Sequence, residues 1–157
     1  MTNISTAFDA IKDRMEALFP SASGWYQMAN PYEAEQNTLA THSKGWGIAL
    51  GPGVNTNRNF SCKLSIQRTI TVTFLLRRYA NELDIDPKET AEKEILESQY
   101  ILIHDFEKTP ALNNSSTGIT RFVYAGDGGI ENVFAGNEAF IKLVTTYELE
   151  YFEHLEP

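Results

Sequence analysis

The chain has 157 residues, 42% hydrophobic and 22% charged, which is the composition of one globular domain and excludes a globally disordered chain. Lys and Arg number 13 against 21 Asp and Glu, and a formal net charge of -8 disfavours general binding to a phosphate backbone. A single cysteine, Cys62, excludes an internal disulfide and a thiolate metal cluster. The sequence contains neither a bilayer-length apolar run nor a secretory signal, so we expect a protein without membrane contact.

An amphipathic helix is predicted at the start of the chain. Apolar residues recur there at the three- and four-residue spacing of one helical face: Ile4, Phe8, Ile11, Met15 and Leu18. Thr2, Asn3 and Ser5 are the candidate N-caps, and Pro20 should end the helix.

The segment from 21 to 45 has no period, which is typical of functional or mobile connections. Trp46, Ile48 and Leu50 then alternate as a short strand. We expect the Gly51-Pro52-Gly53 sequence and a polar loop over 55–59 to end that strand.

The clearest strand follows, with one apolar face formed by Leu64, Ile66, Ile70, Val72, Phe74 and Leu76. Arg68 falls on that apolar face and has two interpretations. A β-bulge near Gln67 and Arg68 would rotate it outward. Alternatively, this end of the sheet faces a wet interface, where Arg68 meets a carboxylate.

A second helix is predicted from Asp86 at the N-cap and Pro87 at the first helical position to about Lys108. Three strands are predicted after it, over 119–124, 130–134 and 141–151, with a hairpin turn at 126–129. The order α-β-β-α-β-β-β indicates a single α+β domain over 1–157. We expect an antiparallel or mixed sheet with both helices packed on one face.

The sequence carries no recognisable catalytic signature. Its glycines match neither a dinucleotide fingerprint nor a phosphate loop, and it has no nucleophile elbow. His42, His104 and His154 lack metal-ligand spacing. Glu148 and Glu150 share one strand face, where a solvated or interface-facing edge explains them better than a glycosidase pair. We therefore predict a protein that is not an enzyme and uses no metal or cofactor.

Charge is distributed in blocks along the chain. Between Arg58 and Arg78 lie five basic residues and no acid, whereas Glu82 to Glu107 carries nine acids. These blocks either pair within the fold or meet across a head-to-tail contact between subunits. The candidate interface residues are Arg58, Arg68, Arg77, Arg78, Glu148, Glu150, Trp25 and Tyr26.

The order of elements resembles the tail terminator proteins of long-tailed bacteriophages, which complete the tail and join it to the head. The phrases that carry the resemblance are Arg68-Thr69-Ile70-Thr71-Val72-Thr73-Phe74 and Val144-Thr145-Thr146-Tyr147-Glu148-Leu149.

The resemblance implies a structural virion protein that forms a hexameric ring with copies of itself on the tail tube. Its expected partners are the tail tube protein and the head–tail connector protein, and DNA passes through without specific binding. Its expected location is the head-proximal end of the virion tail, after assembly in the host cytoplasm. An acidic chain suits DNA passage, because a negative lumen repels phosphate.

Three alternatives stay open. The first is another head–tail connector or a tail tube subunit. The second is an interaction module unrelated to phages. The third, from a different class, is a small-ligand-binding domain or an enzyme, with a pocket lined by Trp25, Tyr26, Tyr32 and Trp46.

Overall fold

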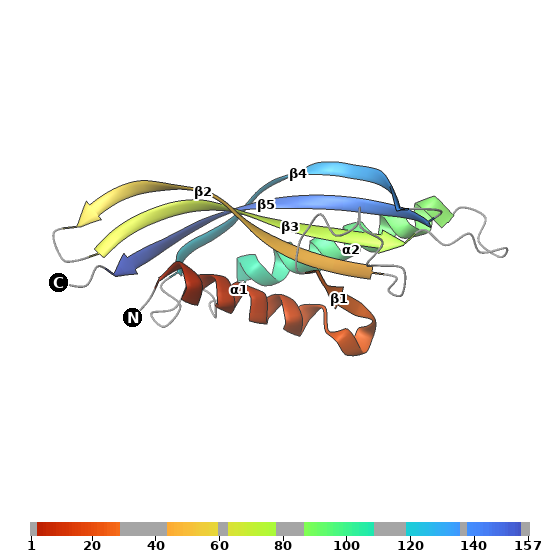
Figure 1. Ribbon diagram of the computed structural model, residues 1–157, viewed down its shortest axis with the longest axis horizontal. Helices are drawn as coiled ribbons and strands as arrows, with labels where there is room; N and C mark the ends of the chain where they lie inside the picture. The colour runs from red at the N-terminus through yellow and green to blue at the C-terminus, as the bar shows by residue number, and fades with distance from the viewer. Residues whose placement is uncertain are drawn as a thin grey trace.

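The computed structural model describes residues 3–28, 44–59, 63–77, 87–108, 119–135 and 138–154. The elements in chain order are α1 (Ile4–Leu18), the 3-10 turn η1 (Ser21–Ser23), β1 (Trp25–Gln27), β2 (Lys44–Asn59), β3 (Lys63–Arg77), α2 (Pro87–Lys108), β4 (Ile119–Ala135) and β5 (Glu138–His154). The strands form one sheet in the order β1-β2-β3-β5-β4 (Figure 1). β1 is parallel to β2 and the other neighbours are antiparallel, which confirms the predicted α+β class with a mixed sheet.

Helix α1 has the predicted bounds, and Ile11 and Met15 are buried as predicted, but Ala7 takes the buried position expected for Phe8, which is half-buried. The Asn3 side chain accepts a hydrogen bond from the Thr6 amide at 3.0 Å, so Asn3 is the N-cap among the three candidates. Ala7, Ile11 and Met15 are buried against the sheet.

The core lies between one face of the sheet and both helices. Alternate residues of β3 and β5 point into it because successive side chains of a strand face opposite ways. Those of β3 are Ile70, Val72, Phe74 and Leu76, and those of β5 include Leu143, Tyr147 and Leu149. Phe106 of α2 packs against Phe122 and Tyr147 with ring centroids 4.9 and 5.5 Å away. Each large side chain buried this way contributes about 1.5–3 kcal/mol.

Helix α2 starts at Pro87 and ends at Lys108, as predicted, although Asp86 lies outside the described residues. An ion pair joins the two helices: Arg14 Nε donates to Asp105 Oδ2 at 2.7 Å, and a second guanidinium nitrogen contacts Oδ1. Within the described residues, neither helix is long and apolar enough to cross a membrane.

Strand β2 is longer than predicted, because the sequence from 51 to 59 continues the strand. Its pairing with β3 shifts register between Leu50 and Gly53 and again between Asn55 and Asn57. Hydrogen bonds to β3 hold the backbone extended past the expected breakers, and Pro52 is accommodated at the irregularity of an edge strand.

The predicted hairpin turn at 126–129 is also wrong. β4 is one strand through this segment, with register shifts between Tyr124 and Gly126 and between Asp127 and Ile130. Gly126 and Gly129 have φ of 151° and 78°, so the glycines form a bulge within the strand and do not reverse the chain. The last third therefore contains β4 and β5 in place of three strands.

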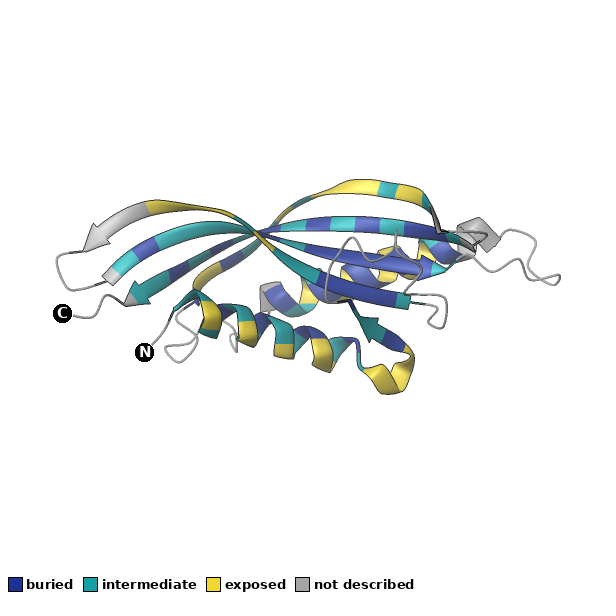
Figure 2. Cartoon of the chain, in the orientation of Figure 1, coloured by how far each residue is buried: buried dark blue, intermediate teal, exposed yellow. Residues whose placement is uncertain are grey.

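The sheet is strongly twisted and longer than the helical layer beneath it (Figure 1). We call its projecting end the arm: residues 51–59 of β2 and 63–67 of β3, with 150–154 of β5 alongside. Figure 2 shows exposed residues on β2 where it enters the arm, on β4 and on the outward side of α1. Neither helix extends beneath the far end of the arm (Figure 1).

Candidate subunit interface

Arg68 stays on the helix side of the sheet, at the base of the arm. β3 pairs with β5 without a register shift from Lys63 to Arg77, so the expected bulge at Gln67 and Arg68 is not in β3. The bulge lies in β2, between the pairs Leu50–Ile70 and Gly53–Arg68. Arg68 Nη1 donates to the Gly51 carbonyl at 2.8 Å, and this backbone oxygen takes the place of the expected carboxylate.

The other basic candidates lie at separate places. Arg77 ends β3, with its guanidinium carbon 6.0 Å from the centre of the Phe140 ring. Arg58 pairs with Leu64 in the arm, but its side chain is not among those described. Arg78 lies outside the described residues. The structure therefore does not bring these four arginines into one described cluster.

Glu148 and Glu150 share the sheet face opposite the helices, as predicted. They are half-buried on β5, which lies between β3 and β4, so the expected position at a sheet edge is wrong. Ser65 of β3 donates its hydroxyl to the Glu150 carboxylate at 3.0 Å. This contact places one carboxylate at the base of the arm on its outer face.

Trp25 belongs to the core. It is 8% exposed and packs against Phe19 and Phe74, with ring centroids 4.8 and 5.9 Å away. Tyr26 points to the opposite face, where it packs beside Met28 and Leu75. The alternation along β1 separates the two aromatic candidates, so Trp25 is not a surface contact.

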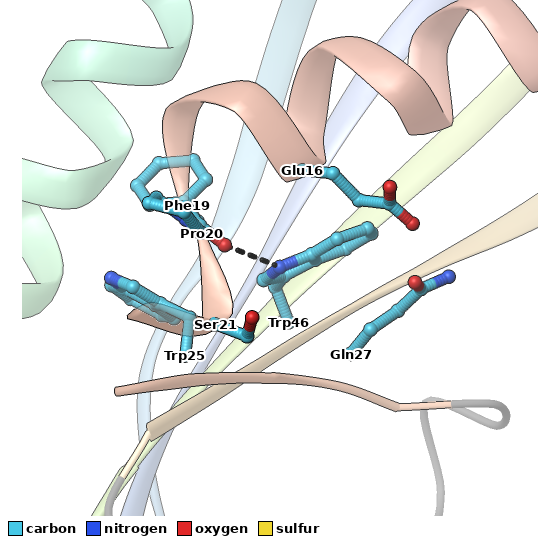
Figure 3. Close-up of a pocket in the computed structure, with 7 residues that line it drawn as sticks. All are labelled: Glu16, Phe19, Pro20, Ser21, Trp25, Gln27 and Trp46. Atoms are coloured by element: carbon cyan, nitrogen blue, oxygen red, sulfur yellow. Dashed lines mark hydrogen bonds between the residues drawn. The ribbon is translucent and has the colours of Figure 1, made fainter. Parts of the chain in front are cut away.

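A pocket of about 370 Å³ opens between the end of α1 and strands β1 and β2 (Figure 3). Its lining comprises Glu16, Phe19, Pro20, Ser21, Trp25, Gln27 and Trp46. Trp46 Nε1 donates to the Phe19 carbonyl at 3.4 Å, which anchors the indole. The Gln27 amide, oriented to satisfy both neighbours, donates to Glu16 at 2.8 Å and accepts from Lys12 at 3.2 Å.

The pocket unites Trp25 and Trp46, two of the four residues expected for an aromatic-lined site. Tyr26 faces the other side of the sheet, and Tyr32 lies outside the described residues. The polar side chains of the lining are the Glu16 carboxylate and the Gln27 amide, which bond each other, and the Ser21 hydroxyl. That arrangement suits binding of a small polar or cationic group.

A polar cluster that the sequence did not predict ties α2 to the β4 bulge. Gln99 Nε2 donates to Asp127 at 3.1 Å and to the Thr145 hydroxyl at 3.3 Å. The Tyr124 hydroxyl and the Gly129 amide also donate to Asp127, both at 2.8 Å. These bonds, led by that from Gln99, lower the pKa of Asp127, and the bond to Asp127 raises the pKa of Tyr124.

Large apolar side chains that are exposed fall into two groups in the part of the chain that is described. Leu50 and Val54 on β2 are 44% and 62% exposed. Leu96, Tyr100 and Ile101 on α2 are 48%, 66% and 46% exposed. The sequence pattern did not identify Val54, Tyr100 and Ile101 as surface residues.

The described residues contain no group of three or more His, Cys, Asp or Glu side chains that could hold a metal ion. Comparison with protein-family models finds no match, and comparison with curated proteins finds no similar sequence.

Proposed function

We propose that this chain is a non-enzymatic ring subunit at the head-proximal end of a long phage tail, where it closes the tail tube. The observation that carries the proposal is the arm, whose far end continues past both helices (Figure 1). At its base lie exposed Leu50 and Val54, side chains that the fold of one copy leaves in contact with water. Exposed apolar groups on a projecting element are typical of a surface that meets another protein.

The distribution of exposed apolar side chains also supports a ring. A closed ring needs two different patches on each subunit, because heterologous contacts run head to tail. Among the residues that the structure describes, exposed large apolar side chains lie on two different elements, β2 and α2. The proposal is further supported by the resemblance in element order to tail terminators; in this chain both helices lie on one face of a sheet that ends in a long C-terminal strand.

The partners of such a ring are the tail tube protein on one side and the head–tail connector on the other. A formal charge of -8 favours a passage through which DNA moves without adhering.

Copy number and position in the particle test the proposal. We expect native mass spectrometry of the purified chain to give a hexamer, and a particle reconstruction to place one ring at the head end of the tube. Phage with a nonsense mutation in this gene should make tails of unregulated length that do not join heads. A chain that stays monomeric at high concentration and is absent from the particle would contradict the proposal.

Copy number also separates this proposal from its nearest competitors. A tail tube subunit is present in many stacked rings, whereas a terminator forms one. A connector subunit would lie against the head and remain there in particles that lack tails.

A second candidate function rests on the pocket lined by Glu16, Trp25 and Trp46. An aromatic wall beside a carboxylate is the chemistry that binds a small cationic ligand. Quenching of tryptophan fluorescence by quaternary and primary amines tests it, with Glu16→Gln as the matched variant. Binding at micromolar concentration that Glu16→Gln abolishes would favour this function, and flat titrations of the wild type would exclude these ligand classes.

A further inference from the structure

We infer that the pocket beside Trp46 binds a free α-amino acid, with its ammonium group at Glu16, its carboxylate at Lys12 and an apolar side chain against the pocket wall. The inference rests on the second candidate function, the small-ligand pocket, and names the ligand class of that pocket. It adds a site for a negative group, which a purely cationic ligand does not need.

A second hollow adjoins the pocket. It has a volume of about 210 Å³ and is lined by Phe8, Lys12, Gln27, Met28, Trp46 and Ile48. Gln27 and Trp46 line both hollows, so the two are neighbouring parts of one depression between α1 and strands β1 and β2. The larger part therefore holds a carboxylate, and the smaller part holds an ammonium group.

The two charges come from one face of α1. Lys12 and Glu16 are four residues apart, so their side chains are neighbours on the helix surface. Among the described residues, no direct ion pair joins them, and each bonds the neutral amide of Gln27. Gln27 reaches them from β1 because alternate side chains of a strand point to the same side. Both charges are thus held apart and satisfied by one uncharged group.

The Gln27 amide shows which chemical pattern the two charges recognise. In the orientation that satisfies both neighbours, its nitrogen donates to Glu16 at 2.8 Å and its oxygen accepts from Lys12 at 3.2 Å. An α-amino acid presents the same pattern of a donor next to an acceptor, since its ammonium and carboxylate are attached to one carbon. Both of these groups are ionised, so their hydrogen bonds to Glu16 and Lys12 are stronger than those of a neutral amide. Gln27 therefore stands in for the ligand and is displaced when it binds.

Apolar surface lies beside the two charges. Trp46 is 1% exposed, and its indole is fixed by the hydrogen bond to the Phe19 carbonyl at 3.4 Å. Figure 3 shows the Glu16 carboxylate and the Gln27 amide at the same side of this indole. A volume of about 370 Å³ lies in the usual range of small-molecule sites. The pocket can therefore take the apolar side chain of an amino acid whose charged end replaces the amide.

Ligands that differ by one charged group test the inference. Leucine carries both charges, isoamylamine lacks the carboxylate and isocaproate lacks the ammonium. The two tryptophans of the chain, Trp25 and Trp46, both line the pocket, so their fluorescence reports binding there and calorimetry gives the Kd. Leucine should bind at least about tenfold more tightly than either analogue, because each analogue loses one charge-assisted contact.

Variants of the three polar residues sharpen the test. Lys12→Met should erase the preference for leucine over isoamylamine, whereas Lys12→Arg, which keeps the charge, should retain most of it. Gln27→Ala should tighten leucine binding at least about threefold, because the ligand no longer displaces an internal amide. Lys93→Met, the same change at an exposed position of α2, should bind leucine like the wild type. Thermal unfolding of each variant without ligand distinguishes lost binding from lost folding.

Other outcomes overturn the inference. If isoamylamine binds as tightly as leucine, or if Lys12→Met keeps the preference for leucine, the pocket is a cation site and the zwitterion is wrong. Weaker leucine binding by Gln27→Ala would contradict displacement of the amide. If leucine, methionine and phenylalanine all give flat titrations while amines bind, this ligand class is excluded and the second candidate function stands. If neither amino acids nor amines bind, both are wrong.

Discussion

Arg68 and Gly53 are packed so closely that a Cβ on the glycine would lie 2.7 Å from Arg68 Nη2. The glycine leaves room for the guanidinium, which then reaches the Gly51 carbonyl across the bulge of β2. The base of the arm therefore depends on the Arg68 guanidinium and on a residue without a side chain at position 53. Arg68 therefore supports the arm as well as carrying charge.

Gly53→Ala should lower the free energy of unfolding by about 1 kcal/mol, because the new methyl displaces the guanidinium from its hydrogen bond. Arg68→Ala should cost a similar amount. In the Arg68→Ala background, Gly53→Ala should have little further effect. Urea unfolding of the four proteins measures this coupling, and additive losses would contradict the proposed displacement.

Ile95→Ala and Leu96→Ala form a matched pair on neighbouring positions of α2. Ile95 is fully buried, so its truncation should cost about 2–5 kcal/mol, whereas Leu96 is 48% exposed and should cost less than about 0.5 kcal/mol. Thermal or urea unfolding measures both at concentrations where the chain is monomeric. Equal losses would mean that Leu96 is covered in the monomer.

Asp105→Asn should destabilise the chain by about 1 kcal/mol, because it removes the carboxylate charge paired with Arg14 between the two helices. The hydrogen bond to that carboxylate raises the pKa of Arg14. Arg14→Ala should also lower the free energy of unfolding, and Arg14→Lys should restore only part of that loss, since an ammonium cannot make the two-nitrogen contact. Full recovery by lysine would show that charge alone matters.

Asp127 should make the fold sensitive to acid. Its pKa is lowered in the folded chain by bonds from Gln99, Tyr124 and Gly129. The stability it contributes is therefore present above the unfolded pKa of about 3.9 and is lost as pH falls through the lower folded value.

As the pH is lowered from about 7 to about 2, the free energy of unfolding should thus fall less steeply for Asp127→Asn than for the wild type. Asp9→Asn, a change at an exposed carboxylate of α1, serves as the control. An unchanged pH profile for Asp127→Asn would show that the cluster around the β4 bulge contributes no acid-sensitive stability.

Local periodicity predicted a large part of the fold. The bounds of α1 and α2 follow from apolar spacing, the Asn3 cap and the Pro residues near their ends. The alternation of β3 and β5 predicted their inward faces. Each of these features is determined by residues a few positions apart, so one stretch of sequence contains the information.

Residues distant in sequence decided the rest. Gly, Pro and Asn predicted breaks in β2 and β4, but hydrogen bonds to β3 and β5 carry both strands through them as bulges. The same dependence explains the misplaced site residues: Trp25 is buried because Phe19 and Phe74 pack on it, and Arg68 bonds Gly51 because β2 lies beside β3. The sequence alone determined the two helices, strands β3 and β5, and which way the apolar faces of these two strands point. Only tertiary structure decided where those segments end against their neighbours and which apolar side chains stay exposed, because pairing and burial depend on partners that no local pattern names.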